Sequence, residues 1–165
     1  MNWMKNVLII LLIVVLLIGG FLLFGYLKGG DRDLGQAPDM TVETTSGERV
    51  TLSSFYKQDG MILVFFDRKS DQSVKLIQNL AAEAGNIPVL LISLQDNAKE
   101  LTAFLTENKV SFPAVADDGK AADTYNIQHG PVNYFIRRDG SVRAVSLSTM
   151  RPGAIRKYLK YIKNS

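Results

Sequence analysis

The hydrophobic pattern changes its period several times between residues 61 and 105. Residues 61–66 form a continuous apolar run bounded by a glycine and an aspartate, which is typical of a strand buried inside a sheet. Apolar residues then recur at helical spacing over 74–84, a second apolar run covers 87–94, and a second amphipathic helix is expected over 98–105. This order favours parallel strands joined by a right-handed crossover, with helices covering the sheet.

Polar residues mark where these helices are expected to begin and end. Ser70, followed by Asp71, is expected to cap the first helix, and Gly85 is expected to end it. Asp96 or Asn97 is expected to cap the second helix. The first helix should therefore begin directly after a short polar turn behind the buried strand.

Two hairpin-like stretches and a last helix flank this central pattern. Residues 41–52 contain two short extended pieces around a turn at 46–48. Strands are expected over 132–136 and 142–147, because Asp-Gly between two apolar runs is a strong hairpin signal. An amphipathic helix is expected over 155–162. The sequence therefore predicts an α/β domain with a central mixed sheet and flanking helices.

An uncharged apolar stretch of 21 residues covers 7–27. Helical rise gives it a length of about 31 Å, against about 30 Å of bilayer hydrocarbon. A cleaved signal peptide would have a shorter apolar region and a small-residue cleavage site, which is not found after Leu27. We therefore expect a short tail at 1–6, a transmembrane signal anchor at 7–27, a linker at 28–34 and a folded domain at 35–165. Basic residues are nearly balanced on the two sides of the span, so charge does not orient it.

The composition excludes several functional classes. The 165-residue chain contains no cysteine, which excludes disulfide bonds, thiolate metal sites and thiol catalysis by this chain. Its 19 basic and 16 acidic residues give a net charge of only +3, so nucleic acid is not an expected partner. Asp67, Asp71, Asp117 and Asp118 are interpreted as turn and cap residues, since no closely spaced acidic loop is present. No metal or cofactor is expected.

A series of short motifs runs along residues 35–164. They are G-Q-A-P-D-M at 35–40, S-G-E at 46–48, V-T-L-S at 50–53, M-I-L-V-F-F at 61–66, F-P at 112–113, D-D-G-K at 117–120, Y-N-I at 125–127, G-P at 130–131 and Y-F-I-R-R-D-G at 134–140. Their order and spacing resemble the TlpA/ResA branch of the thioredoxin-like redoxins, a group related to the AhpC/TSA proteins. The resemblance implies a thioredoxin-like fold for the domain.

This sequence differs from that family at the residues that carry out the family's redox chemistry. The family's Cys-x-x-Cys motif opens the first long helix, where the positive helix end lowers the pKa of the first thiol. Here that place reads Ser70-Asp71-Gln72-Ser73. Lys69 replaces the tryptophan that commonly precedes the motif, and Val64 stands where thioredoxins have a buried acid. Serine forms no disulfide, so the sequence predicts a vacated redox site.

The resemblance also implies a peptide-binding surface beside this site. In the family the proline that matches Pro131 is cis, and the backbone before it pairs with an extended substrate peptide. Such pairing uses main-chain groups and does not require the cysteines. The expected groove consists of Lys69, Ser70, Asp71, Gln72, Ser73, His129, Gly130 and Pro131.

These features predict a single-pass membrane protein whose thioredoxin-like domain lies on the extracytoplasmic side and has lost redox activity. The compartment is implied by the resemblance, because anchored relatives generally face outward and serve thiol handling during cytochrome or other envelope-protein maturation. The expected partners are the membrane and an extended polypeptide or envelope assembly protein. The chain is expected to act as a binding or accessory module rather than as an enzyme.

Other interpretations stay open. The chain is a TlpA/ResA-type thiol–disulfide oxidoreductase if both motif cysteines were replaced by serine in this sequence, and a partner protein could instead supply the thiols. Hydrolysis by Ser70 or Ser73 with His129 as base is disfavoured, because no orienting acid or oxyanion hole is evident. Ser70 is then a helix cap and His129 a loop residue. The basic residues between Arg151 and Lys163 are interpreted as the solvent face of the last helix.

Overall fold

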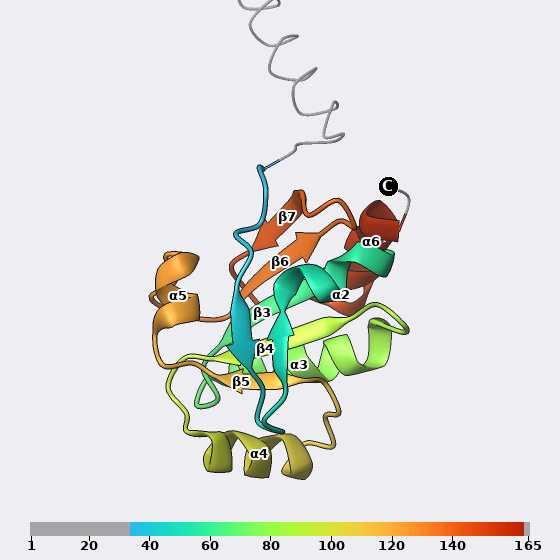
Figure 1. Ribbon diagram of the computed structural model, residues 1–165. Coiled ribbons are helices and arrows are strands. Elements are labelled where there is room, and N and C mark those ends of the chain that lie inside the picture. The colour runs from blue at the N-terminus through green and yellow to red at the C-terminus, as the bar shows by residue number, and fades with distance from the viewer. Residues whose placement is uncertain (1–33, 164–165) are drawn as a thin grey trace, which may run out of the picture. The chain divides into compact units, whose positions relative to one another are not determined.

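A five-stranded mixed sheet lies at the centre of this computed structural model, which describes residues 34–163 (Figure 1). In spatial order the strands are β5 (Ala114–Ala116), β4 (Val89–Ser93), β3 (Met61–Phe66), β6 (Val132–Ile136) and β7 (Val142–Ser146). β4 is parallel to both β3 and β5, whereas β6 is antiparallel to both β3 and β7. The predicted central mixed sheet is confirmed.

Helices and a small hairpin cover both faces of the sheet (Figure 1). One face carries α3 (Asp71–Glu83), α4 (Ala98–Glu107) and α6 (Pro152–Lys163), whose apolar residues share one core. The other face carries α2 (Leu52–Asp59), α5 (Lys120–Thr124) and the hairpin of β1 (Thr41–Glu43) and β2 (Arg49–Thr51). The predicted α/β class with flanking helices is therefore confirmed.

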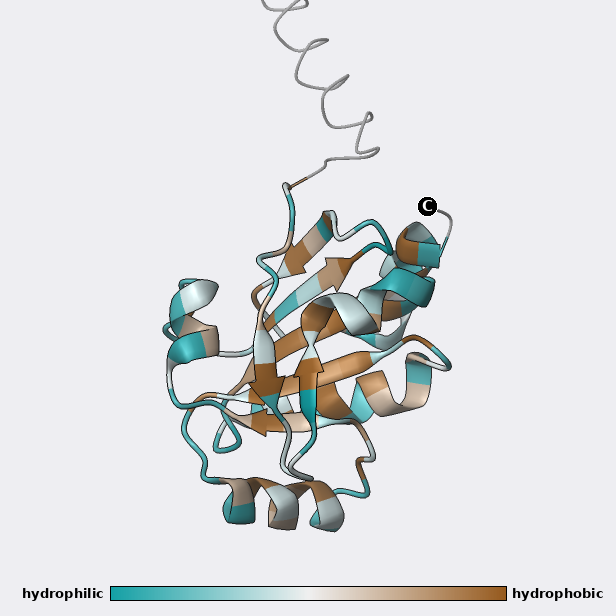
Figure 2. Cartoon of the chain, viewed as in Figure 1, coloured by the Kyte–Doolittle hydropathy of each residue, from teal (hydrophilic) through white to brown (hydrophobic). Residues whose placement is uncertain are grey.

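The central strand β3 is apolar throughout because both of its faces are covered. Its even-numbered side chains belong to the core under α3, α4 and α6, and its odd-numbered side chains belong to the core on the opposite face. All six are completely buried. Figure 2 shows the contrast between hydrophobic central strands and helices that carry both hydrophobic and hydrophilic residues. Two-sided burial explains why residues 61–66 show no alternation of period two.

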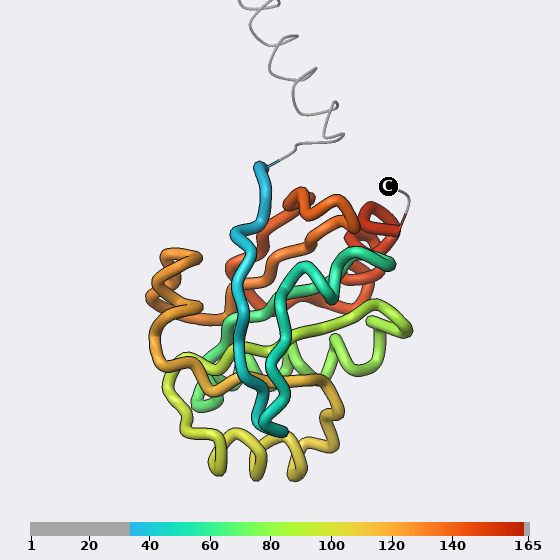
Figure 3. Tube along the Cα trace, in the orientation of Figure 1, coloured from blue at the N-terminus to red at the C-terminus, as the bar shows by residue number. Residues whose placement is uncertain are grey.

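The N-terminal part of the domain runs across one face of the sheet, where Figure 3 shows the chain turning back at the hairpin. It also covers part of each sheet edge. Along β7, Leu34 N donates to Val142 O and Val142 N donates to Gly35 O, at 3.0 and 2.8 Å. On β5, Thr45 N donates to Ala114 O at 2.8 Å. These bonds occupy edge groups that would otherwise invite pairing with another chain.

The predicted helix ends are partly right. Gly85, with a φ of +58°, follows α3 as expected. Asn97 rather than Asp96 caps α4, because its Oδ1 accepts a hydrogen bond from Glu100 N at 2.9 Å. Ser70 occupies the N-cap position of α3, but its side chain makes no capping hydrogen bond, so a side-chain cap at this residue is wrong.

Three short elements are not predicted by the sequence pattern. Leu52, expected at the end of an extended piece, begins α2 instead, and its N–H donates to Met40 O at 2.9 Å. β5 is too short to show a period and exists because it pairs with β4. In α5, the carboxylate of Asp117 accepts hydrogen bonds from the N–H groups of Ala121 and Ala122 at 3.0 and 2.9 Å. Each element depends on contacts that local periodicity does not show.

The predicted tail (1–6), membrane span (7–27) and all but the last residue of the predicted linker (28–34) lie outside the described residues. Within residues 34–163, no helix is both long and apolar enough to cross a membrane.

Candidate functional site

The carboxyl end of β3 leads directly into the segment where the redox motif is expected. Asp67 begins a tight turn, in which Ser70 N donates to Asp67 O at 3.0 Å and Lys69 N donates to Asp67 Oδ1 at 2.9 Å. α3 then begins at Asp71, while Ser70 keeps an extended backbone with φ of −89° and ψ of 120°. Position 70 therefore lies at a helix N-terminus, where the first backbone N–H groups have no partner within the helix.

The two serines of this segment lie at different depths. Ser70 is partly exposed, whereas Ser73 is completely buried. The Ser73 hydroxyl accepts a long hydrogen bond from Asp67 N at 3.4 Å. The site thus has one accessible and one inner position, and a hydroxyl group occupies both. Hydroxyl groups do not form a disulfide, so this pair has no thiol chemistry.

The hydrolytic arrangement is not assembled in the structure. His129 is exposed, and within residues 34–163 it forms no hydrogen bond with Ser70 or Ser73. A hydrolytic serine needs a base within hydrogen-bond reach and a third group that orients that base. Within residues 34–163, neither serine therefore has His129 as a hydrogen-bonded base, and no group orients His129 for that role.

Gly130 and Pro131 lie beside the end of β3. The peptide bond between them is cis, as the resemblance to the redoxins implies. A Cβ atom on Gly130 would lie 2.8 Å from Phe66 Cα and 3.0 Å from Phe65 O, so the two backbones touch. Val132, the next residue, pairs with Phe65. The fold thereby brings the 129–131 loop to the strand that leads into the Asp67–Ser70 turn.

The loop between β7 and α6 packs beside the first half of α3. The sequence did not predict this contact. Thr149 Oγ1 donates to Gln72 O at 2.7 Å, and Asn79 Nδ2 donates to Met150 O at 2.8 Å. These two bonds fix the loop against the first half of α3. No periodic or motif signal in the sequence points to this contact, because 71 or more residues separate the partners.

Asn133 holds the same loop from the sheet. It is completely buried and pairs with Val64, the residue that the sequence resemblance matches to the buried acid of thioredoxins. Its Nδ2 donates to the carbonyls of Ser146 and Ser148 at 3.3 and 3.2 Å, while its Oδ1 has no hydrogen-bond partner among residues 34–163. The buried polar residue opposite Val64 is thus an amide, which holds a loop and carries no titratable proton.

A cavity of about 430 Å³ lies between the first turns of α3 and the β7–α6 loop. Of the expected groove residues, only Asp71 and Gln72 line it. Lys69, Ser70, Ser73, His129, Gly130 and Pro131 do not line it. The sequence did not predict the other main lining residues, which are Lys75, Asn79, Thr149 and Arg151.

A polar network anchors the turn before Ser70 to the neighbouring strand. Arg68 Nε donates to Asp96 Oδ1 at 2.7 Å, and Ser93 Oγ donates to the other oxygen of the same carboxylate. The hydrogen bond and negative charge of Asp96 raise the pKa of the Arg68 guanidinium above its ordinary value. Leu94 N also donates to Phe66 O at 3.1 Å. These contacts hold the Asp67–Ser70 turn against the end of β4.

Three of the four acidic residues singled out in the sequence, Asp67, Asp117 and Asp118, make contacts that support local structure. The Asp67 and Asp117 carboxylates accept backbone N–H groups, and Asp118 forms an ion pair with Lys120. No group of three or more histidine or acidic residues among residues 34–163 is arranged to hold a metal ion. A second cavity, of about 480 Å³ between the β1–β2 hairpin and α5, contains none of the expected site residues.

Comparison with known proteins finds thiol–disulfide oxidoreductases and thioredoxin-like proteins. The thiol–disulfide oxidoreductase ResA of Bacillus subtilis is 24% identical over 162 residues, which cover 93% of this chain and 90% of ResA. The thioredoxin-like protein YneN of the same organism is 23% identical over 156 residues, with 90% and 91% covered. These relatives match over nearly their whole length, although this chain has no cysteine.

The fold itself matches solved structures of the same kind. A secreted thiol-disulfide isomerase from Corynebacterium glutamicum superposes with a TM-score of 0.67 at 18% identity, covering 78% of this chain and 85% of that protein. At this identity the likeness establishes the thioredoxin-like fold alone. The model of the AhpC/TSA family matches residues 35–145, which include both motif serines and the cis proline. The chain therefore belongs to the AhpC/TSA family.

Proposed function

We propose that this chain is a membrane-anchored, extracytoplasmic thioredoxin-like protein that binds extended polypeptide without thiol chemistry. Its role would be that of an accessory module in envelope-protein maturation. One observation carries the proposal: the family's fold and cis proline are retained, while serine occupies both positions of the redox motif.

Polypeptide binding does not depend on the missing sulfur atoms. An extended peptide pairs with main-chain N–H and C=O groups, and side chains around it add selectivity. The proposed groove lies between residues 69–73 and residues 129–131. Lys69 and His129 are both exposed, and Gly130 is in contact with the end of β3, just before the Asp67–Ser70 turn. These contacts support a surface shared by the two segments.

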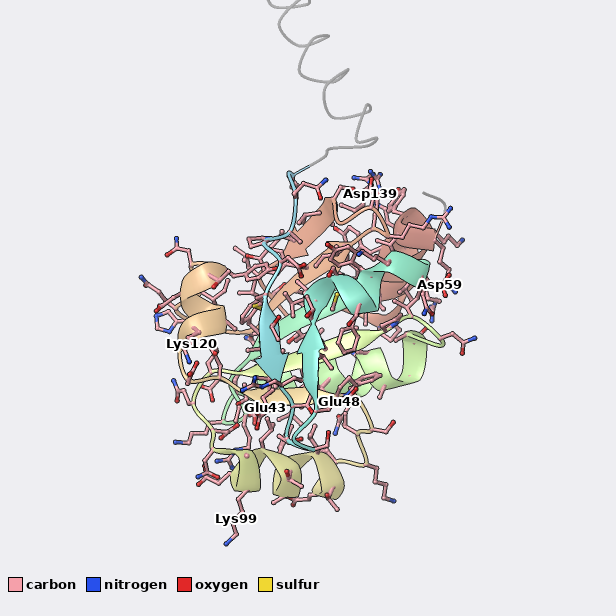
Figure 4. All side chains as sticks on the ribbon, in the orientation of Figure 1. Glu43, Glu48, Asp59, Lys99, Lys120 and Asp139 are labelled. Carbon is pink, nitrogen blue, oxygen red and sulfur yellow. The ribbon has the colours of Figure 1, made fainter. Side chains whose placement is uncertain are left out.

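Photo-crosslinking tests the groove. A benzoylphenylalanine placed at Lys69 is expected to crosslink to β-casein, an unfolded cysteine-free polypeptide, because position 69 lies at the proposed groove. The matched control places the same group at Lys99, an exposed lysine that projects from α4 into solvent (Figure 4). Crosslinking is measured by mass shift on a denaturing gel with the full-length chain in mild detergent. Equal crosslinking at both positions would contradict the groove.

The membrane anchor is proposed from the apolar stretch 7–27 and from the resemblance to outward-facing redoxins. An alkaline phosphatase fused after Ser165 is expected to be active, because that enzyme folds only outside the cytoplasm. The chain is expected to stay in the membrane fraction after carbonate washing. Deleting residues 7–27 serves as the control and should release the chain. An inactive fusion with an intact anchor would contradict the proposed orientation.

A second candidate function is favoured by one specific observation. Both motif positions carry the same isosteric replacement, Ser70 and Ser73, as expected if two cysteines of a thiol–disulfide oxidoreductase had been replaced together. The native coding sequence decides between the candidates. Cysteine codons at positions 70 and 73 would replace the first proposal with the second.

A further inference from the structure

Two cations line the cavity between α3 and the β7–α6 loop without carboxylate partners. Lys75 extends from α3, and Arg151 directly precedes α6. Neither forms an ion pair within residues 34–163. Among the described residues that line the cavity, Asp71 is the only carboxylate, so the two cations leave these lining residues with one uncompensated positive charge.

These cations are not used to hold the two helices together. The ion pair between α3 and α6 is made elsewhere, where Arg156 Nη1 lies 2.6 Å from Glu83 Oε1. Lys75 and Arg151 are both exposed. Their charges therefore contribute little to packing and are available to a ligand.

Hydrogen bonds hold the two sides of the cavity in place, and its volume suits a single side chain. The hydrogen bonds from Thr149 to Gln72 and from Asn79 to Met150 set the distance between the loop and α3. A volume of about 430 Å³ accepts a side chain and its solvent, but not a folded partner. Because Asp71 and Gln72 belong to both the cavity and the proposed groove, a peptide in the groove passes beside the cavity.

We propose that this cavity receives an acidic side chain of the bound polypeptide, with Lys75 and Arg151 as its counter-charges. The inference rests on the proposed function and adds to it a preference for acidic over neutral segments. Asp71 opposes this preference, because its carboxylate lines the same wall. Removing a cation and removing Asp71 should therefore change affinity in opposite directions.

Fluorescence anisotropy with two labelled peptides tests the preference. The peptides have the same length, blocked ends and no cysteine, and they differ only in carrying glutamate or glutamine at the same positions. The full-length chain in mild detergent is expected to bind the glutamate peptide about threefold to tenfold more tightly, which lies within the range expected for two exposed ion pairs. The difference should shrink as salt is raised.

Variants assign the effect to the cavity. Lys75→Gln combined with Arg151→Gln should remove the preference, and Asp71→Asn should increase it. The matched control, Lys99→Gln combined with Arg138→Gln, removes the same charges from exposed residues on α4 and on the β6–β7 turn. It should leave both affinities unchanged.

The outcomes separate this inference from the proposed function. Equal binding of both peptides, or a preference that survives Lys75→Gln with Arg151→Gln, overturns the acidic site while leaving polypeptide binding intact. Binding of neither peptide overturns both. If Lys99→Gln with Arg138→Gln removes the preference for the glutamate peptide equally well, the preference comes from overall charge, and the acidic site is overturned.

Discussion

With dithiothreitol as the reductant that regenerates the dithiol, the double substitution Ser70→Cys with Ser73→Cys is expected to give this chain disulfide reductase activity in an insulin turbidity assay, about tenfold or more above the unchanged chain. The two positions are three residues apart at the start of α3, and Val74 N donates to Ser70 O at 3.1 Å in the first helical turn. Helix geometry places their Cα atoms about 5 Å apart, inside the range that a disulfide spans. The N-terminus of α3 favours the thiolate at position 70.

The depth of the two positions also suits the reaction. Position 70 is partly exposed and can attack a substrate disulfide, while position 73 is buried and can resolve the mixed disulfide from inside. The unchanged chain should remain at background in the same turbidity assay. Turnover by the unchanged chain would contradict the absence of thiol chemistry proposed above.

Single-cysteine variants provide the control. Without added reductant, Ser70→Cys alone should form a mixed disulfide with substrate that persists, because the chain has no second thiol to resolve it. Free-thiol titration of the oxidised double variant reports whether the internal disulfide has formed. An oxidised but inactive double variant would show that more than the sulfur atoms is missing, and Lys69 and Val64 would be the residues to change next.

The substitution Gly130→Ala is expected to lower the free energy of unfolding by about 2–4 kcal/mol. The new Cβ would lie 2.8 Å from Phe66 Cα and 3.0 Å from Phe65 O. These are backbone atoms of the central strand, whose side chains fill both cores, so they cannot move aside like the end of a flexible side chain. The 129–131 loop must shift instead. Urea unfolding followed by circular dichroism measures the change.

The matched control is Gly153→Ala. A Cβ at position 153 meets only the end of the Arg156 side chain, at 4.0 Å, and the residue lies in the first turn of α6. Because alanine is the better helix former, stability should stay the same or rise by up to about 1 kcal/mol. An unchanged unfolding midpoint for Gly130→Ala would mean that the loop does not touch β3, and the proposed groove would lose its geometric basis.

Local sequence patterns were sufficient wherever an element depends on its own residues. The apolar run 61–66 indicated a strand, and the helical spacing behind position 70 indicated α3. The Asp-Gly turn at 139–140 predicted the β6–β7 hairpin. Patterns failed for α2, α5 and β5, which are short and owe their conformation to neighbours. β5, for example, forms a strand because β4 supplies its parallel partner.

The candidate site likewise has features that the sequence shows directly and features that depend on long-range contacts. Serine at positions 70 and 73 is a fact of the sequence, and it removes thiol chemistry whatever the fold. The different depths of the two serines and the contact of Gly130 with β3 depend on residues far apart in the chain. The same holds for the cavity that brings Lys75 to Arg151. The sequence by itself determined which chemistry this protein lacks, because that depends on atom types. Only the tertiary structure decided which side chains line the proposed binding surfaces, because long-range packing sets the distances between them.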